Sequence, residues 1–381
     1  MTGFVSIMTE TMPAGLLPQI SAGLGVPPAL SGQLVSIYAL GSLLAAIPLT
    51  ILTAHWPRRH VLLATLVGFT VFNTVTALSS NYTLIMGARL LAGAAAGLAW
   101  SLIPGYARQM VRPEQRGKAM AIAMIGTPIA LALGVPLGTW LGSLTGWRMA
   151  FGVMTGVSIA LVLASLLVVP NLPGQSSSTR LGLKRVFMIP GVRPVLFVSV
   201  LWMLAHNVLY TYIAPFVVPA ALEARVDLVL LVFGMAAIVG IAAAGKLVDA
   251  HLRTSVLSGL VVFAIASTVL GVFGSNPIAV FIGVMLWGIT FGGAATLLQT
   301  ALADAAGDGA EVALSMSVVA WNLAIALGGA LGGVLIVGLG GASIPWVMLG
   351  MIILALVVSA LARAHGFTAG TRRGAGSVAA H

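Results

Sequence analysis

Apolar stretches of roughly 18 to 25 residues recur along the whole chain, separated by short segments that hold most of the charged residues. Each stretch can cross a hydrocarbon core of about 30 Å at 1.5 Å per residue, and the stretches lack the alternation of barrel strands. Since backbone groups in lipid must be satisfied internally, the stretches are predicted to be helices. We expect about twelve transmembrane spans, at roughly 1–21, 32–54, 60–79, 82–106, 119–142, 149–170, 194–219, 228–249, 254–274, 277–302, 311–338 and 343–363.

The spans divide into six, a polar connection, and six more. The connection contains Pro173, Gly174 and a serine run at 176–178, a composition typical of a flexible linker. The predicted fold class is therefore an all-α membrane protein built as two pseudo-symmetric six-helix bundles. Its predicted parts are an N-terminal bundle (1–170), a cytoplasmic linker (171–193), a C-terminal bundle (194–365) and a cytoplasmic tail (366–381).

The two halves also repeat in sequence at an offset of 195 residues. Such a repeat is a sign of an internally duplicated membrane fold. The matching glycine pairs are Gly93 and Gly97 with Gly288 and Gly292, and Gly134 and Gly138 with Gly329 and Gly333.

Composition and charge support a membrane protein and exclude other classes. Hydrophobic residues make up 59% of the 381 residues and charged residues only 7%, whereas soluble domains are about a quarter charged. The net charge of +10 does not indicate nucleic acid, because the basic residues lie in connections between apolar stretches. The chain has no cysteine, so disulfides and thiolate metal sites are excluded, and we expect no metal and no cofactor. Glu10 interrupts the first apolar stretch, so no cleavable signal peptide is expected.

The distribution of lysine and arginine predicts the orientation. Of the 18 such residues, fifteen fall in the predicted inner loops and tail, Arg148 and Arg225 fall in outer loops, and Arg89 lies within a span. Inner loops of membrane proteins carry this excess of positive charge. We therefore expect both termini to be cytoplasmic, in the inner membrane of a bacterium.

Two short loops resemble a motif of a known protein family. Residues 245–253 are similar to the loop signature G-x-L-x-D-x-x-x-R of the major facilitator superfamily, with Gly245, Asp249 and Arg253 at its fixed positions. The first-half copy keeps only its basic end, Arg58 and Arg59. Together with six plus six spans and a basic linker, these loops resemble the superfamily. The resemblance implies the major facilitator fold and a cytoplasmic gate that uses the loop aspartate.

Further motifs resemble the exporter branch of that superfamily. Arg89 with Gly93 is similar to its fourth-helix R-x-x-x-G element, and Gly134-Val-Pro136-Leu-Gly138 is similar to the fifth-helix pattern of its antiporters, one residue off the usual spacing. The stretch Thr9–Gln19 is similar to the first helix of the twelve-helix drug:proton antiporter family. The resemblance implies a secondary active transporter, working as a monomer, that exports drug-like compounds, sugars or related metabolites by proton antiport.

Other functions remain as alternatives. The same fold supports gradient-driven uptake or uniport of a small polar solute, and fold alone does not separate these from export. An integral membrane enzyme would need a nucleophile with a base, but only His206 among the six histidines lies inside a span. A sensor that transports nothing is a further alternative. Gly240 to Lys246 matches a phosphate-loop pattern formally, yet Leu247 replaces the required serine or threonine, so no nucleotide site is predicted.

Two ionisable residues inside spans are the main candidates for chemistry. Nine residues precede Glu10, which places it roughly 14 Å deep at 1.5 Å per residue. Desolvation there disfavours the ionised carboxylate, which suits a group that binds and releases a proton. Arg89 cannot discharge itself and needs an acceptor. The acceptor is either Glu10, or an anionic or hydroxylated substrate, or backbone carbonyls freed near Pro13 and Pro18.

Polar and amphipathic residues inside apolar spans are the candidates for binding a substrate. Aromatic and amide side chains that line a cavity suit sugars, nucleosides or flat drugs, although interhelical hydrogen bonds and interface belts explain such residues equally. The candidates are Gln33, Trp100, His206, Asn207, Tyr210, Tyr212, Trp287, Gln299, Trp321 and Asn322. The glycine pairs are expected to allow close helix packing, with sliding between helices as their functional alternative.

Overall fold

The computed structural model describes residues 1–112, 122–174 and 182–368, and regular structure in these ranges is helical throughout. The serine run, Arg116, Lys118 and most of the predicted tail lie outside the described residues. The helices of the first half are α1 (Thr2–Gly15), α2 (Leu17–Leu24), α3 (Pro28–Leu52), α4 (Arg58–Leu78), α5 (Tyr82–Gln109), α7 (Gly126–Ile129), the π-helix η2 (Ala130–Gly134), α8 (Val135–Thr145) and α9 (Trp147–Val168).

The second half begins with the short helix α10 and ends with α16. Its helices are α10 (Leu183–Phe187), α11 (Val192–Thr211), α12 (Ile213–Phe216), η3 (Val218–Ala220), η4 (Glu223–Arg225), α13 (Val226–Phe273), α14 (Pro277–Ala306), η5 (Gly307–Gly309), α15 (Ala310–Gly338), η6 (Gly341–Ser343) and α16 (Ile344–Leu361). Across both halves, ten helices within the described ranges are long and apolar enough to cross a membrane.

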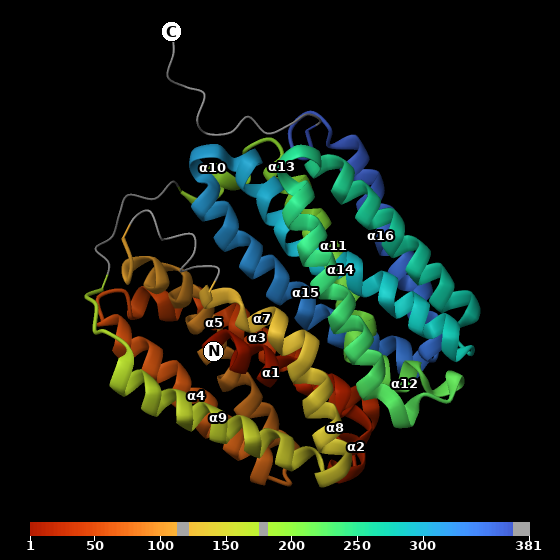
Figure 1. The fold of residues 1–381 in the computed structure, drawn as a ribbon, viewed down its shortest axis with the longest axis horizontal. Coiled ribbons are helices and arrows are strands. Elements are labelled where there is room, and N and C mark those ends of the chain that lie inside the picture. Colours follow the sequence, from red (N-terminus) through yellow and green to blue (C-terminus); the bar gives the residue numbers. More distant parts are fainter. Residues whose placement is uncertain (113–121, 175–181, 369–381) are drawn as a thin grey trace.

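Several predicted spans differ from the helices found. The first span is divided at Leu16 (φ −108°, ψ 10°) into α1 and α2, because Pro13 and Pro18 interrupt helical hydrogen bonding there. The spans predicted at 228–249 and 254–274 run together as α13, and the junction between them is a kink instead of a separate loop. A single residue with non-helical geometry, His251 (φ −137°, ψ 37°), separates the two parts, and Figure 1 shows α13 turning back at its upper end.

The helices of each half lie together. In Figure 1 the red-to-yellow helices α1 to α9 occupy one side of the molecule, and the green-to-blue helices α10 to α16 occupy the other. Between the halves, α3 packs against α15, and η2 and α8 pack against α13. One end of the molecule carries α2, α12 and η4, and we call it the α2 end. The opposite end carries α10 and the turn of α13, and we call it the α10 end.

Close helix crossings recur at the 195-residue offset found in the sequence. Glycines of α5 lie directly on carbonyl groups of α3, and glycines of α14 lie on carbonyl groups of α13, so closely that a Cβ atom would collide with the carbonyl oxygen. The crossing pairs are Gly93 with Tyr38, Gly97 with Ser42, Gly288 with Phe233, and Gly292 with Ala237. Helix starts follow the same offset, since Asn81 caps α5 and Asn276 caps α14 through their side-chain oxygens.

The interface between the halves is closed at the α2 end and open toward the α10 end. Along the stripe of α3 that faces α15, Ser36 is buried beside Gly329. Further along that stripe, Leu44, Ile47 and Ile51 are exposed. Residues three and four apart share one helix face. The face of α3 toward α15 is therefore covered by the second half at the α2 end and exposed toward the α10 end.

Candidate functional site

Arg89 lies at the centre of the first half and is completely buried, with 0% of its surface exposed. It projects from α5 toward α1 and α3. Its Nε donates to the carbonyl oxygen of Leu34 at 3.1 Å, its Nη2 donates to that of Glu10 at 3.2 Å, and its Nη1 donates to that of Thr9. The guanidinium is therefore held by three backbone carbonyls from two helices, a geometry that its fork of five N–H donors suits.

Pro13 explains why an acceptor is available at Thr9. A proline has no N–H, so the carbonyl four residues before it loses its partner in the helix. That carbonyl belongs to Thr9, and Arg89 supplies the missing donor. The sequence left three kinds of acceptor open for Arg89. The described hydrogen bonds of Arg89 go to backbone carbonyls, two of them in α1 near Pro13, and not to the carboxylate of Glu10.

Aromatic rings complete the surroundings of Arg89. Its guanidinium carbon lies 4.8 Å from the ring centroid of Tyr38 and 5.8 Å from that of Phe151, within the range of cation–π attraction. The Tyr38 hydroxyl donates to the Ser6 carbonyl at 2.9 Å. Sequence reasoning missed both rings, because aromatic residues are ordinary in an apolar span.

Glu10 is buried in α1, with 7% of its surface exposed. Its carboxyl lies within electrostatic range of Arg89 and Tyr38 in its own half and of Tyr210 in the other half. In the described hydrogen bond between Glu10 and Arg89, the acceptor is the backbone carbonyl of Glu10 and not its carboxyl. The carboxyl therefore stands at the meeting of the two halves, next to a fixed positive charge that is bound elsewhere.

Asn73 of α4 is a polar member of this region that sequence reasoning missed. Its Nδ2 donates to the Thr9 hydroxyl at 3.0 Å, and its buried Oδ1 has no hydrogen-bond partner in the protein. The sequence could have identified Asn73, since an amide side chain inside an apolar span is itself unusual. We call Glu10, Tyr38, Asn73 and Arg89 the Arg89 cluster.

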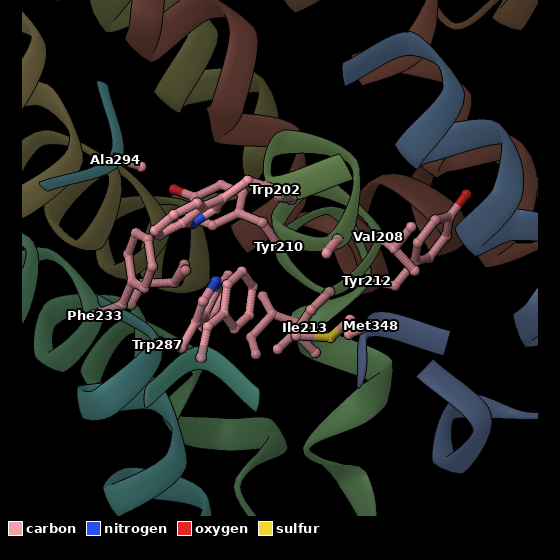
Figure 2. Close-up of a cluster of buried hydrophobic side chains, with 14 of the residues drawn as sticks. Trp202, Val208, Tyr210, Tyr212, Ile213, Phe233, Trp287, Ala294 and Met348 are labelled. Carbon is pink, nitrogen blue, oxygen red and sulfur yellow. The ribbon is translucent and has the colours of Figure 1, made fainter. Parts of the chain in front are cut away.

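Three predicted substrate residues meet in the second half. His206 and Tyr210 of α11 gather with Trp287 of α14, together with Phe233 of α13 and Phe291 of α14, which were not predicted. We call these five residues the aromatic cluster. The ring of His206 stacks on that of Phe291, with centroids 3.7 Å apart, and lies 5.1 to 5.5 Å from the other three rings. Figure 2 shows Tyr210, Phe233 and Trp287 approaching one another from three helices.

The aromatic cluster contains polar atoms without partners. The Nδ1 of His206 and the Nε1 of Trp287 are buried and make no hydrogen bond in the protein. Thr11 of α1 is the side-chain neighbour of the Tyr210 hydroxyl, so the cluster borders the first half. Buried polar groups are normally hydrogen-bonded, and each exception calls for an explanation.

Tyr212 belongs to a different contact. Figure 2 shows Tyr210 of α11 and Tyr212, the residue that follows α11, projecting in opposite directions. The hydroxyl of Tyr212 lies 3.2 Å from the carbonyl oxygen of Ala29 in α3 and 2.9 Å from that of Gly329 in α15, and Gln33 Nε2 lies 3.4 and 3.3 Å from the same two oxygens. These side chains bridge the two halves at the α2 end. We call this contact the Tyr212 clasp.

A cavity of about 250 Å³ also lies between the halves at the α2 end. Its lining includes Gln19 of α2, Thr139 of α8 and Asp227 of α13. Thr139 is 3% exposed, and its hydroxyl has no partner in the protein.

The other predicted substrate residues lie outside the aromatic cluster and the Tyr212 clasp, although Trp321 packs against the same group of side chains as Phe291. Trp100 lies against Gly3 of α1 and is half-buried. The amides of Asn207 and Asn322 donate to carbonyls of their own helices, at Met203 and Val318. Two further candidates are at least partly accessible, since Trp321 is half-buried and Gln299 is exposed.

The predicted gating residues lie at the α10 end. Arg253 donates to carbonyl oxygens at the end of α16, those of Ser359, Ala360 and Phe367. At the equivalent place in the first half, Arg58 donates to the Ala54 carbonyl at 2.9 Å, and Arg59 lies 3.5 Å from the Val169 carbonyl at the end of α9. Asp249 is exposed, and Gly245 has open space around its Cα.

The glycine and proline motif of the fifth predicted span forms an irregular helix. The π-helix η2 ends at Gly134, and α8 begins at Val135 with Pro136 in its first turn. Short π-helices inside α-helices are frequent at functional sites. A Cβ at Gly134 would collide with the Met8 side chain, and one at Gly138 would lie 3.2 Å from it, so both glycines face α1.

Known proteins that are similar to this chain include transport proteins. The family model described as Major Facilitator Superfamily matches residues 1–249. A chloramphenicol efflux pump of Mycobacterium tuberculosis is 32% identical over 344 residues, covering 87% of this chain and 83% of the relative. The inner membrane transport protein YdhP of Escherichia coli is 30% identical over 343 residues (88% and 87%). A probable sugar efflux transporter of Helicobacter pylori is 26% identical over 342 residues (89% and 88%).

Proposed function

This chain belongs to the Major Facilitator Superfamily, and on that premise we propose that it exports small organic molecules by proton antiport with alternating access. One observation carries the proposal: the buried carboxyl of Glu10 lies within electrostatic range of Arg89 in its own half and of Tyr210 in the other half. The direction of transport is supported by the efflux activity in the names of similar proteins. Those names also suggest chloramphenicol-like drugs or sugars as substrates.

In the proposed topology the chain crosses the inner membrane of a bacterium twelve times, as a monomer of two pseudo-symmetric bundles. The first crossing is α1 with α2, and α13 supplies two crossings that meet at His251. The basic residues of the predicted inner loops support an orientation with the α10 end and both termini in the cytoplasm. The α2 end then faces outward, so the described conformation is closed to the outside.

Proton binding at Glu10 would couple to this closure through desolvation. An ionised carboxylate inside the membrane costs on the order of 2.5–3.5 kcal/mol, so the closed and dry state favours the protonated carboxyl. Opening toward either side admits water, and the carboxyl can then release its proton. Arg89 holds α1 in place through backbone carbonyls, so its positive charge remains beside Glu10 throughout the cycle.

The substrate would bind between the halves, near the aromatic cluster and the Arg89 cluster. Tyr210 adjoins Thr11 and feels the charge of Glu10, so a molecule bound there would lie next to the proton-binding carboxyl. Competition between substrate and proton for this region is the simplest form of antiport, because each ligand then promotes release of the other.

The test is transport by the purified protein in lipid vesicles with an imposed pH gradient. We expect Glu10→Gln to fold and to bind substrate but to lose transport driven by the gradient. Glu223→Gln, which changes an exposed carboxyl of η4, is the matched control and should behave as wild type. Gradient-driven transport by the Glu10→Gln protein at the wild-type rate would refute the mechanism. Accumulation of substrate on the proton-rich side of wild-type vesicles supports antiport, and movement with the proton indicates uptake.

A further inference from the structure

We propose that the aromatic cluster binds the ring of a neutral, planar aromatic substrate that carries hydrogen-bond acceptors, and that Phe291 occupies the place of this ring when no substrate is bound. This inference rests on the proposed function, because it takes the cluster to be part of the transport site. It adds the chemical class of the substrate and the position of its ring.

Phe291 differs from the other members of the cluster in two ways. It is half-buried, whereas Phe233 and Trp287 are fully buried and His206 and Tyr210 are nearly so. Phe291 also packs against a second group of side chains at the junction of the halves, which includes Ala39 of α3 and Ala324 of α15. It is thus the member that borders the surface between the two halves.

The contact between Phe291 and His206 is the geometry that an aromatic ligand would reproduce. The two rings are nearly parallel, at 14°, with centroids 3.7 Å apart. The remaining ring contacts of His206 are tilted by 30° to 43° at 5.1 to 5.5 Å. A flat ring that entered from between the halves could replace Phe291 on the face of His206 with the same stacking distance.

The polar atoms of the cluster define what such a ring must carry. Trp287 Nε1 is only a donor and is buried without a partner. The Tyr210 hydroxyl, which borders Thr11, can also donate. A ligand that carries nitro, carbonyl or hydroxyl oxygens would satisfy them. A cation would satisfy neither donor, although aromatic side chains alone would attract it. A sugar without an aromatic ring would lack the surface that stacks on His206.

Three probes separate these possibilities. They are 4-nitrophenyl β-D-glucoside, methyl β-D-glucoside, which lacks the aromatic ring, and tetraphenylphosphonium, which is aromatic but cationic. Binding to the purified full-length protein in detergent is measured by equilibrium dialysis without any pH gradient. We expect the nitrophenyl compound to bind and the methyl glucoside to bind much more weakly. Binding of the phosphonium cation or the methyl glucoside as tightly as the nitrophenyl compound would overturn the proposal, and so would absence of nitrophenyl binding.

Substitutions then locate the ring. Trp287→Phe keeps a ring and removes one donor, so affinity for the nitrophenyl compound should fall roughly two- to tenfold. Phe291→Ala removes the competing ring and should raise affinity, and Phe291→Leu serves as a second variant if the alanine protein does not fold. Trp202→Phe is the matched control, because its Nε1 is equally buried and unpartnered but its ring contacts Phe263 instead. Equal effects of Trp202→Phe and Trp287→Phe, or weaker binding in both folded Phe291 variants, would overturn the assignment.

This experiment separates the inference from the proposed function. Equilibrium binding requires neither proton coupling nor export. Normal binding results with no gradient-driven transport would therefore reject the antiport mechanism alone. Normal antiport with binding indifferent to Trp287 and Phe291 would reject the aromatic site alone.

Discussion

At the scale of single residues, Arg89 and Pro13 act as a pair although they lie in different helices. The proline leaves the Thr9 carbonyl without its helical partner, and the buried guanidinium donates to that carbonyl and to two others. An arginine cannot lose its charge at neutral pH, so these acceptors, together with the nearby rings, are what make its complete burial tolerable. The pair also fixes α1, the helix that carries Glu10.

Replacing Arg89 with lysine should therefore destabilise the protein although the charge is kept. A lysine ammonium is a single point and cannot reach carbonyls of α1 and α3 with the geometry of a planar fork. Leaving a buried carbonyl unsatisfied costs about 1–3 kcal/mol, and we expect a loss of this order, seen as a lower midpoint of thermal unfolding in detergent. Arg148→Lys is the control, since Arg148 is half-exposed and also donates to carbonyls, those of Ala77 and Ser79. Equal midpoints for the two variants would contradict this account.

The sequence identified both ionisable residues of the site but not the atoms that they contact. Glu10 and Arg89 stand out because charge inside an apolar span is rare. Whether Arg89 reaches a carboxylate or a carbonyl depends on how α1, α3 and α5 cross, which no single residue determines. Asn73 could have been found by the same polarity rule. Phe233 and Phe291 could not, because one phenylalanine in a membrane span resembles another until packing selects it.

At the scale of helices, the glycines of α5 and α14 pack on backbone, whereas Gly134 and Gly138 pack on the side chain of Met8. Gly93 lies on the Tyr38 carbonyl and Gly288 on the Phe233 carbonyl, 195 residues later in the chain. These contacts set the crossing of α3 with α5 and of α13 with α14, and hence position Tyr38 beside Arg89 and Phe233 in the aromatic cluster. Span lengths predicted most helices correctly, and the polar residues at 245–253 marked where the break at His251 falls. They did not show that the junction would be a kink at a single residue.

Adding one methyl group at such a crossing should have a large effect. In Gly93→Ala the new Cβ would meet a backbone oxygen that can move only with its helix, so α3 and α5 must separate. Overpacking of this kind typically costs about 1–3 kcal/mol, and we expect a lower unfolding midpoint and less monodisperse protein on gel filtration. Gly87→Ala in the same helix is the control, because no atom lies within 4 Å of its Cβ position. If Gly93→Ala were as stable as Gly87→Ala, the close crossing would be refuted.

At the scale of the whole molecule, the contact between the halves is uneven. The Tyr212 clasp joins α3, α11 and α15 at the α2 end, while Leu44, Ile47 and Ile51 are exposed toward the α10 end. Opening at the α2 end must break the clasp, because its two carbonyl acceptors belong to different halves. The clasp is thus expected to contribute to the equilibrium between outward-closed and outward-open states.

Tyr212→Phe removes the hydroxyl that bridges the halves and should shift this equilibrium toward opening. Loss of one hydrogen bond is worth about 0.5–1.5 kcal/mol, which corresponds to a roughly two- to tenfold larger open population. Because the natural chain has no cysteine, Thr139→Cys provides a single buried reporter at the α2 end, and its rate of reaction with a membrane-impermeant maleimide in intact cells measures opening. In the Tyr212→Phe background this rate should rise by the same factor.

The matched control for this measurement is Tyr82→Phe. Tyr82 also donates to a carbonyl of α3, that of Leu30 at 2.9 Å, but both residues belong to the first half. Its loss removes an equivalent hydrogen bond without loosening the contact between the halves, so the reaction rate at residue 139 should not change. A rate that rises equally in both backgrounds would mean that the hydroxyl of Tyr212 stabilises the α2 end only locally. A rate unchanged by Tyr212→Phe would mean that α3 and α15 stay closed through apolar packing alone, and that opening is governed by the cluster around Val35 and Ala324.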